Sequence, residues 1–308
     1  MLSGLVIVLL PLALGYLVPV RHAGAMALIN RGVNASVYVI LLLMGVSLAG
    51  LDDLASQLSR MGGQALTLFA VIGACNLAGL WWLSNRLGLT ADPSRVVPGA
   101  PLSKLAAMAG SLALVAAVAL GVALGLTGKA LTLRGFHAGA ETLAEWALYV
   151  LLALIGCQLR NSGMPLRQIL LNRHGLAIAL VLAATSLAGG LLAAPLLDLR
   201  ASEGLALAAG FGWYSLSGIL VGDALGPALG GVAFFNDLAR ELAAFVLIPL
   251  VIRRHAALAI GYGGATSMDF TLPVIQQHGG VTCVPVAVVS GFILSLLSPP
   301  LILFFLSL

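Results

Sequence analysis

The chain has 308 residues, of which 60% are hydrophobic and only 8% are charged. Soluble domains carry about 25% charged residues, so this composition excludes a water-soluble protein and predicts an all-α polytopic membrane protein. The net charge of +4 at pH 7 is accounted for by basic connecting loops and requires no nucleic-acid partner.

Apolar runs of about 20 residues, the length that a helix needs to cross about 30 Å of hydrocarbon, recur along the sequence. They predict eight transmembrane helices, at residues 2–20, 35–50, 63–84, 105–127, 143–158, 176–197, 230–252 and 281–307. Two further segments, 203–227 and 256–278, are apolar but interrupted by Gly, Ser and Pro, which favours re-entrant or broken helices. We therefore expect a single membrane domain over residues 1–308. The first span follows no basic region, which favours a retained helix over a cleaved signal peptide.

Basic residues gather in alternate loops, after the first, third and fifth spans, namely Arg21, Arg31, Arg86, Arg95, Lys104, Arg160, Arg167 and Arg173. The positive-inside rule therefore places the amino terminus outside. Arg253 and Arg254 face the cytoplasm if the segments 203–227 and 256–278 each enter the membrane and return to the side from which they came. This arrangement has eight transmembrane spans, with both termini outside. The alternative is that both segments cross, with five elements in each of the halves 1–165 and 166–308. Such an inverted repeat is typical of secondary transporters.

The seventh span contains the stretch "AFFNDLAREL", in which Asp237, Arg240 and Glu241 occupy one side of a helix, with Asn236 beside them. An ionised side chain at the bilayer centre costs about 2.5–3.5 kcal/mol on insertion scales, so we expect this side to face protein or a water-filled cavity. A clamp that only holds helices together is the alternative. Arg240 neutralises one carboxylate, which leaves one negative charge in excess.

The stretch "GGATSMDFTLP" places Asp269 between a glycine pair and a proline, with the hydroxyls of Thr266 and Ser267 beside it. Unwound backbone next to a carboxylate predicts a cation site, because irregular backbone at membrane depth is tolerated only where protein or a cavity surrounds it. The alternative is a surface loop in which Asp269 caps a helix.

A third candidate is "GFGWYSLSG", which combines glycines with Trp213, Tyr214, Ser215 and Ser217. Its glycines permit a second broken helix, and its aromatic rings suit an ammonium group through a cation–π contact of about 0.5–2 kcal/mol. A position in the interfacial aromatic belt is the alternative. The five histidines show no metal-ligand spacing, so we expect no metal site.

These three stretches, together with "GCQLRNSG", "LNRHG" and "GYLVPVR", resemble the lysine exporter family LysO over essentially the whole chain. The resemblance implies a bacterial inner-membrane exporter, not an enzyme, for L-lysine and its toxic analogue thialysine. It also implies exchange for protons, with the proton gradient as energy source and no cofactor. The two essential intramembrane acids of the family fall on Glu241 and Asp269.

Lysine carries a net charge of +1, and a membrane potential that is negative inside opposes its exit by about 2.3 kcal/mol per 100 mV. Export therefore needs coupling, and carboxylates that bind the ammonium when ionised and release it when protonated provide this. We expect the breaks at 210–218 and 263–268 to face each other at mid-membrane, and Arg240 or Asn236 to orient Glu241 or meet the substrate carboxylate.

Three other functions fit parts of the pattern. A monovalent cation/proton antiporter also uses paired intramembrane acids and an inverted repeat. A membrane aspartyl protease needs a Gly-x-Gly-Asp signature, which is only half present in "LVGD" before Asp223. A purely structural scaffold leaves the two buried acids unexplained.

Overall fold

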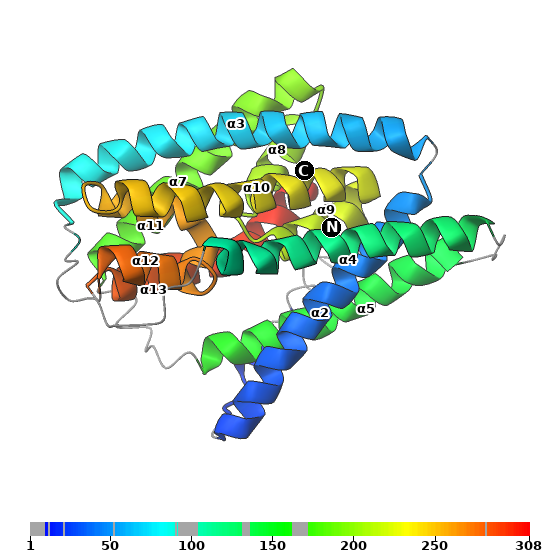
Figure 1. Cartoon of the computed structure of the whole chain (residues 1–308), viewed down its shortest axis with the longest axis horizontal. Coiled ribbons are helices and arrows are strands. Elements are labelled where there is room, and N and C mark those ends of the chain that lie inside the picture. Colours follow the sequence, from blue (N-terminus) through cyan, green and yellow to red (C-terminus); the bar gives the residue numbers. More distant parts are fainter. Residues whose placement is uncertain are drawn as a thin grey trace.

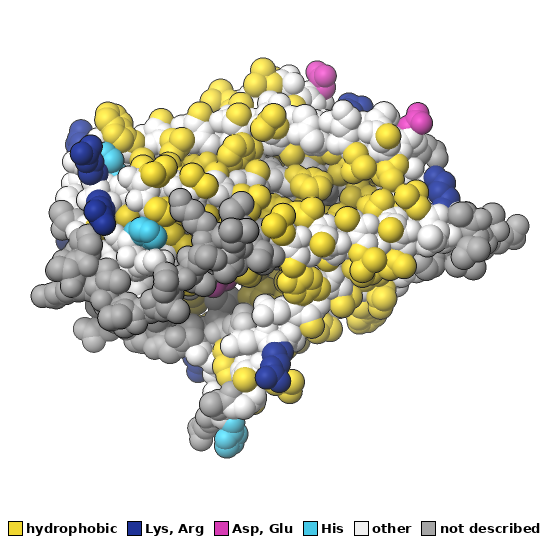
Figure 2. Space-filling model, viewed as in Figure 1, with side chains coloured by type: hydrophobic (Ala, Val, Ile, Leu, Met, Phe, Trp, Pro, Cys, Tyr) yellow, Lys and Arg dark blue, Asp and Glu magenta, His cyan; other side chains and the backbone are white. Residues whose placement is uncertain are grey.

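The computed structural model describes residues 10, 11, 13–20, 22–51, 53–89, 91, 104–130, 136–161, 172–280 and 282–308. Every regular element in this part of the chain is a helix, as expected where lipid offers backbone groups no hydrogen bonds. Among the described residues, five helices are long and apolar enough to cross a membrane: 24–49, 54–87, 112–129, 173–197 and 283–306. Figure 2 shows hydrophobic side chains over the middle of one face, with Lys and Arg at its margins. Residues 2–9 and 12 of the first expected span, 2–20, lie outside the described residues.

In the first half of the chain, the described residues include four long continuous helices. They are α2 (Ala23–Ala49), α3 (Leu54–Leu87), α4 (Lys104–Ala130) and α5 (Phe136–Arg160). Both α4 and α5 pack against α2, at the lower right in Figure 1. Close approach of α2 and α4 requires glycine, because a Cβ at Gly45 would overlap the Val118 carbonyl and one at Gly121 the Leu42 carbonyl.

Three of these four helices extend well beyond the expected spans, and α2 differs most. The span expected at 35–50 is too short, because α2 already begins at Ala23. Asn30, Arg31 and Asn34 read as a loop in the sequence, but Asn30 and Asn34 are four residues apart and share one face of a continuous helix. Polar side chains on one face do not end a helix when that face meets a cavity.

The second half contains three long helices and two broken segments. The long helices are α7 (Arg173–Ala193), which continues as η2 (Ala194–Leu197), α10 (Pro227–Val251) and α13 (Cys283–Leu306). They confirm the expected positions 176–197, 230–252 and 281–307 to within a few residues. Pro227 stands in the first turn of α10, where its missing N–H is not needed.

The first broken segment consists of α8 (Ala201–Ala208) and α9 (Tyr214–Leu225). The chain turns between them, with Phe211 at φ 50° and Gly212 at φ 90°. Helix α8 runs back along α7, since Gly204 lies against Gly190, and α9 runs antiparallel to α10, since Gly222 and Gly230 touch.

The ends of α7 and α10 show where this segment enters and leaves. Gly189 of α7 lies against Ile72 of α3, and Gly231 of α10 lies against Met61 of α3. Helix α7 therefore ends, and α10 begins, toward the same end of α3. The α8–α9 segment is a hairpin that returns to the end of the helix bundle from which it starts.

The second broken segment consists of α11 (Ala256–Gly263), the short 3₁₀ helix η3 (Gly264–Met268) and α12 (Leu272–Gly279). A Cβ at Gly279 would lie 2.5 Å from Ile252 and 3.0 Å from the Sγ of Cys283, so both ends of the segment are adjacent. This segment is also a hairpin, and it starts from the end of the bundle where α10 finishes. Figure 1 shows α12 beside α13, at the left.

Both hairpins lie after residue 200, whereas α2, α3, α4 and α5 are continuous. The interruptions expected at 203–227 and 256–278 are confirmed as breaks in the helices. The two halves therefore differ in the described residues, and the five-plus-five inverted repeat stays a prediction.

Candidate functional site

The tips of the two hairpins touch each other. The main-chain N–H of Ala265, in η3, donates a hydrogen bond of 3.0 Å to the carbonyl oxygen of Phe211, in the α8–α9 turn. The guanidinium of Arg240, from α10, donates to the same oxygen. Gly264 has φ 63°, and a Cβ there would overlap both this guanidinium and the Phe211 oxygen. The two breaks thus face each other, as expected from the sequence, and α10 fixes their contact.

Asp237 of α10 holds the α8–α9 turn in place. Its carboxylate accepts hydrogen bonds from the main-chain N–H of Gly212 at 3.0 Å and from the hydroxyl of Ser217 at 2.6 Å. The Asn236 side-chain amide lies 3.3 Å from the same carboxylate. Asp237 is 2% exposed, and its hydrogen bond with Gly212 satisfies a backbone N–H that has no regular helix partner at this point.

Asp237 and Arg240 thus clamp the α8–α9 turn to α10. A clamp between helices was the alternative that the sequence left open for these residues. Asn236, Asp237 and Arg240 are buried, and none of them lines the cavity described below. Arg240 donates to the Phe211 carbonyl, and a contact between Arg240 or Asn236 and the substrate carboxylate stays a prediction. Glu241 is also buried, at 2% exposure.

A cavity of about 840 Å³ lies beside the hairpin tips. This volume falls in the range of about 300–1,000 Å³ that is usual for small-molecule sites. Helices α2, α5 and α13 and both hairpins form most of its wall. Its polar lining residues are Asn30, Asn34, Tyr38, Gln158, Trp213, Tyr214, Ser215, Thr266, Asp269 and Ser295. Among the lining residues that the structure describes, Asp269 is the one with a formal charge.

Asp269 stands just after η3, where the backbone of the second hairpin is unwound. Its side chain is exposed to the cavity, and Oδ1 accepts a 2.6 Å hydrogen bond from the N–H of Phe270. The Thr266 hydroxyl donates to the Gly263 carbonyl at 2.8 Å, and the Ser267 hydroxyl donates to the carbonyls of Gly264 at 2.7 Å and Ala287 at 2.9 Å. These hydroxyls satisfy the broken helix, which leaves the carboxylate to face the cavity.

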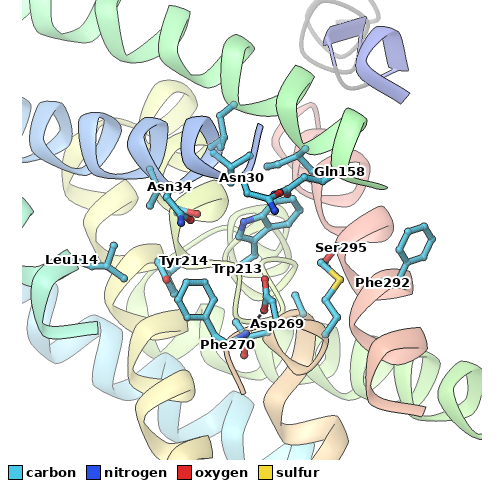
Figure 3. A pocket seen from close by; sticks show the side chains of 18 of the residues that line it. Asn30, Asn34, Leu114, Gln158, Trp213, Tyr214, Asp269, Phe270, Phe292 and Ser295 are labelled. Carbon is cyan, nitrogen blue, oxygen red and sulfur yellow. Dashed lines mark hydrogen bonds between the residues drawn. The ribbon is translucent and has the colours of Figure 1, made fainter. Parts of the chain in front are cut away.

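The aromatic residues of the first hairpin contribute another part of the wall. Trp213 and Tyr214 both line the cavity, and Figure 3 shows the Trp213 indole near Asp269. Tyr214 packs edge-on against Phe234 of α10, with ring centroids 5.8 Å apart. Both Glu241 and Asp269 lie within electrostatic range of the Tyr214 hydroxyl. Asp269 thus faces the cavity while Glu241 is buried beyond its lining, and Tyr214 is near both.

Sequence reasoning missed the amide side chains on the other wall. Asn30 and Asn34 come from α2 and Gln158 from α5, and the Gln158 Nε2 donates to the Asn30 Oδ1 at 2.8 Å. The four-residue spacing of Asn30, Asn34 and Tyr38 was the available signal, since it marks one face of a helix. It was hidden because residues 21–34 were expected to form a loop.

The described helices, the two hairpins and the cavity define a polytopic helical membrane protein with a cavity of the size usual for small-molecule sites. By sequence, the chain belongs to the lysine exporter LysO family, whose model matches residues 115–306.

Two relatives show the extent of the similarity. Lysine exporter LysO of Escherichia coli (strain K12) is 50% identical over 305 residues, which cover 99% of each chain. A putative lysine exporter of Haemophilus influenzae (strain ATCC 51907 / DSM 11121 / KW20 / Rd) is 45% identical over 161 residues, 51% of this chain and 83% of that protein. No solved structure matches the chain.

Proposed function

We propose that the chain exports L-lysine, and analogues such as thialysine, in exchange for protons, and that Asp269 binds the cationic side chain of the substrate. The observation that carries this proposal is the single carboxylate in a cavity large enough for an amino acid. Membership of the lysine exporter LysO family supports the same substrate.

Charge balance favours a cationic amino acid over other solutes. Lysine has a net charge of +1, and the described lining has one negative charge, on Asp269. A neutral amino acid would leave this carboxylate unbalanced at membrane depth, and an acidic one would be repelled. A bare monovalent cation would balance the charge but leave most of the 840 Å³ without contacts.

Trp213 gives the cavity a surface that suits an ammonium group. An indole is the best aromatic partner for a cation, and such a contact contributes about 0.5–2 kcal/mol. Tyr214, Ser215 and Thr266 lie in the same wall. The substrate ammonium therefore meets a carboxylate and an aromatic face from two different hairpins, whose contact at Phe211 and Ala265 fixes their distance.

Proton coupling is proposed to use both acids. Ionised Asp269 binds the substrate. When a proton arrives from outside, the protonated carboxyl group releases the substrate, so proton and substrate compete for one carboxylate. Glu241 is the second acid, buried on α10 and within electrostatic range of Tyr214, which lines the cavity. We assign it to proton transfer rather than to substrate contact, because it does not line the cavity.

The membrane arrangement follows from the hairpins. We infer eight transmembrane helices with two re-entrant hairpins that enter from opposite faces, because each hairpin returns to its own end of the bundle. Arg253 and Arg254 then share the cytoplasmic side with Arg86 and Arg173, in agreement with the positive-inside rule. Both termini lie in the periplasm, and the membrane is the bacterial inner membrane.

The proposal is tested in inside-out membrane vesicles, in which respiration acidifies the lumen and a fluorescent indicator reports the lumenal pH. Addition of lysine or thialysine is expected to discharge the proton gradient in vesicles that contain the wild-type protein. Glu241→Gln and Asp269→Asn are expected to abolish the discharge. Asp198→Asn, at an exposed turn position outside the cavity, is the matched control and is expected to behave as wild type.

Other outcomes separate the parts of the proposal. Uptake of radiolabelled lysine without any change in lumenal pH would remove the proton coupling and keep the exporter. Discharge by sodium but not by lysine would replace the proposal with a monovalent cation/proton antiporter.

A further inference from the structure

A pair of amide side chains stands on the wall of the cavity away from Asp269. Asn30 comes from α2 and Gln158 from α5, and they are joined by the 2.8 Å hydrogen bond from Gln158 Nε2 to Asn30 Oδ1. Figure 3 shows both on one side of the Trp213 indole and Asp269 on the other, with Asn34 beside the pair.

The hydrogen bond within the pair leaves a donor and an acceptor for a ligand. An amide has two N–H donors and one carbonyl acceptor. When Gln158 donates to Asn30, the carbonyl of Gln158 and the NH₂ group of Asn30 remain available. The opposite orientation of the two amides would also leave one carbonyl and one NH₂. The pair therefore presents both kinds of group in either case.

A donor and an acceptor side by side suit the head group of an amino acid, that is, its α-ammonium and α-carboxylate together. The carboxylate of the head accepts from the NH₂ group, and its α-ammonium donates to the carbonyl. The head carries no net charge, and this wall has no charged residue among those described. A Lys or Arg here would bind the carboxylate but repel the α-ammonium, whereas neutral amides serve both.

The position of the pair also argues for a ligand rather than for packing. Asn30 is exposed to the cavity, and Gln158 is partly exposed. A hydrogen bond between exposed side chains adds little to folding, because water replaces it in the unfolded chain. The end of α5 that carries Gln158 is tied to the residues before α2, since Asn161 accepts from the N–H of Val20 at 2.8 Å.

We propose that Asn30 and Gln158 bind the α-ammonium and carboxylate of the transported amino acid, while Asp269 binds its side-chain ammonium. This inference rests on the proposed function. It adds an explanation of how the protein distinguishes an amino acid from a diamine that lacks the carboxylate. Asn34, on the same face of α2, completes this subsite.

The test compares lysine with 1,5-diaminopentane, which is lysine without its carboxylate, as ligands of the purified protein in lipid nanodiscs. The wild-type protein is expected to bind lysine at least about tenfold more tightly, since a hydrogen bond to a charged group is worth this much. In Asn30→Leu and in Gln158→Leu, lysine affinity is expected to fall about tenfold, and diamine affinity is expected to fall less, because the diamine has no carboxylate whose hydrogen bond could be lost.

Two further variants sharpen the result. Asn30→Asp is expected to weaken lysine binding by repelling its carboxylate, and to strengthen diamine binding because the second ammonium gains a carboxylate. Asn85→Leu makes the same change from amide to leucine as Asn30→Leu, at an exposed site of α3 outside the cavity, and is expected to leave both affinities unchanged.

Retained binding of the diamine shows that a variant is folded. An equal loss of both ligands in Asn30→Leu and Gln158→Leu would overturn the inference, and so would undiminished preference for lysine. Failure of the wild-type protein to bind lysine at all would overturn the proposed function, and this inference with it.

Discussion

The main-chain N–H of Ala265 donates a hydrogen bond of 3.0 Å to the carbonyl oxygen of Phe211, so the two hairpins meet at their turns. Trp213 follows Phe211 by two residues, and Asp269 follows Ala265 by four. The contact therefore sets how far the aromatic face of the cavity stands from its carboxylate. The hydrogen bond from Arg240 to the same oxygen ties this distance to α10.

Gly264→Ala is expected to destabilise the protein strongly. The left-handed conformation costs an L-residue about 1–2 kcal/mol, and the new methyl group would overlap Arg240 and Phe211. Gly62→Ala is the matched control, because a Cβ there meets nothing within 4 Å on the helix α3, and alanine stabilises a helix by up to about 1 kcal/mol. Thermal unfolding in detergent checks both, and equal midpoints for the two variants would contradict the hairpin contact.

Asp237→Ala is expected to reduce folding stability rather than substrate affinity alone. It leaves the Gly212 N–H and the Ser217 hydroxyl without their acceptor and removes the negative charge of Asp237 from beside the buried Arg240. Breaking such a buried arrangement costs about 3–5 kcal/mol. The yield of monodisperse protein and its unfolding temperature measure this. A normal unfolding temperature with lost lysine binding would instead make Asp237 a substrate ligand.

Trp213→Leu is expected to weaken lysine binding by roughly 2- to 30-fold, the equivalent of a cation–π contact of about 0.5–2 kcal/mol. Trp213→Phe is expected to lose less, because the ring face remains. The backbone bond from the Trp213 N–H to the Gly210 carbonyl, 2.9 Å long, is kept in both. Equal affinities in both variants, measured by equilibrium binding, would show that the indole only fills space.

Most of the fold was predictable from the sequence because bilayer thickness fixes the length of an apolar helix. The spans at 176–197, 230–252 and 281–307 agree with α7–η2, α10 and α13, and both interrupted segments are broken where glycine, serine and proline gather. The predicted start of the second span, residue 35, was wrong, because α2 begins at Ala23. Polar residues that face a cavity resemble a loop when only hydropathy is considered.

The part of the site that the broken segments supply was predictable, since five candidate residues line the cavity: Trp213, Tyr214, Ser215, Thr266 and Asp269. Ionisable groups inside apolar runs are conspicuous, so Asp269 and Glu241 were found by composition. Sequence spacing cannot show which of them faces a cavity, because that depends on how α10 and the hairpins pack. Likewise, Asp237 and Arg240 could not be assigned to the α8–α9 turn before Gly212 and Phe211 were seen beside them. Neutral amides such as Gln158 carry no comparable signal.

Lysine binding is expected to weaken as the pH falls, over a range in which lysine itself keeps its charge. Protonation of Asp269 removes the negative charge that the ammonium needs, so proton and substrate exclude each other. Any residual lysine binding by Asp269→Asn is expected to be independent of pH. Titration of lysine affinity against pH measures both, and an unchanged pH dependence in Asp269→Asn would assign the competition to another group.

Equilibrium binding of radiolabelled lysine to the purified protein, compared between wild type, Asp269→Asn and Asp198→Asn, tests the assignment of Asp269 most directly. The loss of one partner of a desolvated charge pair costs about 2–5 kcal/mol, so Asp269→Asn is expected to bind lysine roughly 30-fold or more weakly with an unchanged unfolding temperature. Asp198→Asn, the same substitution at an exposed turn with φ 54°, is expected to bind as wild type. Wild-type affinity in a folded Asp269→Asn protein would contradict the assignment of this carboxylate to the substrate.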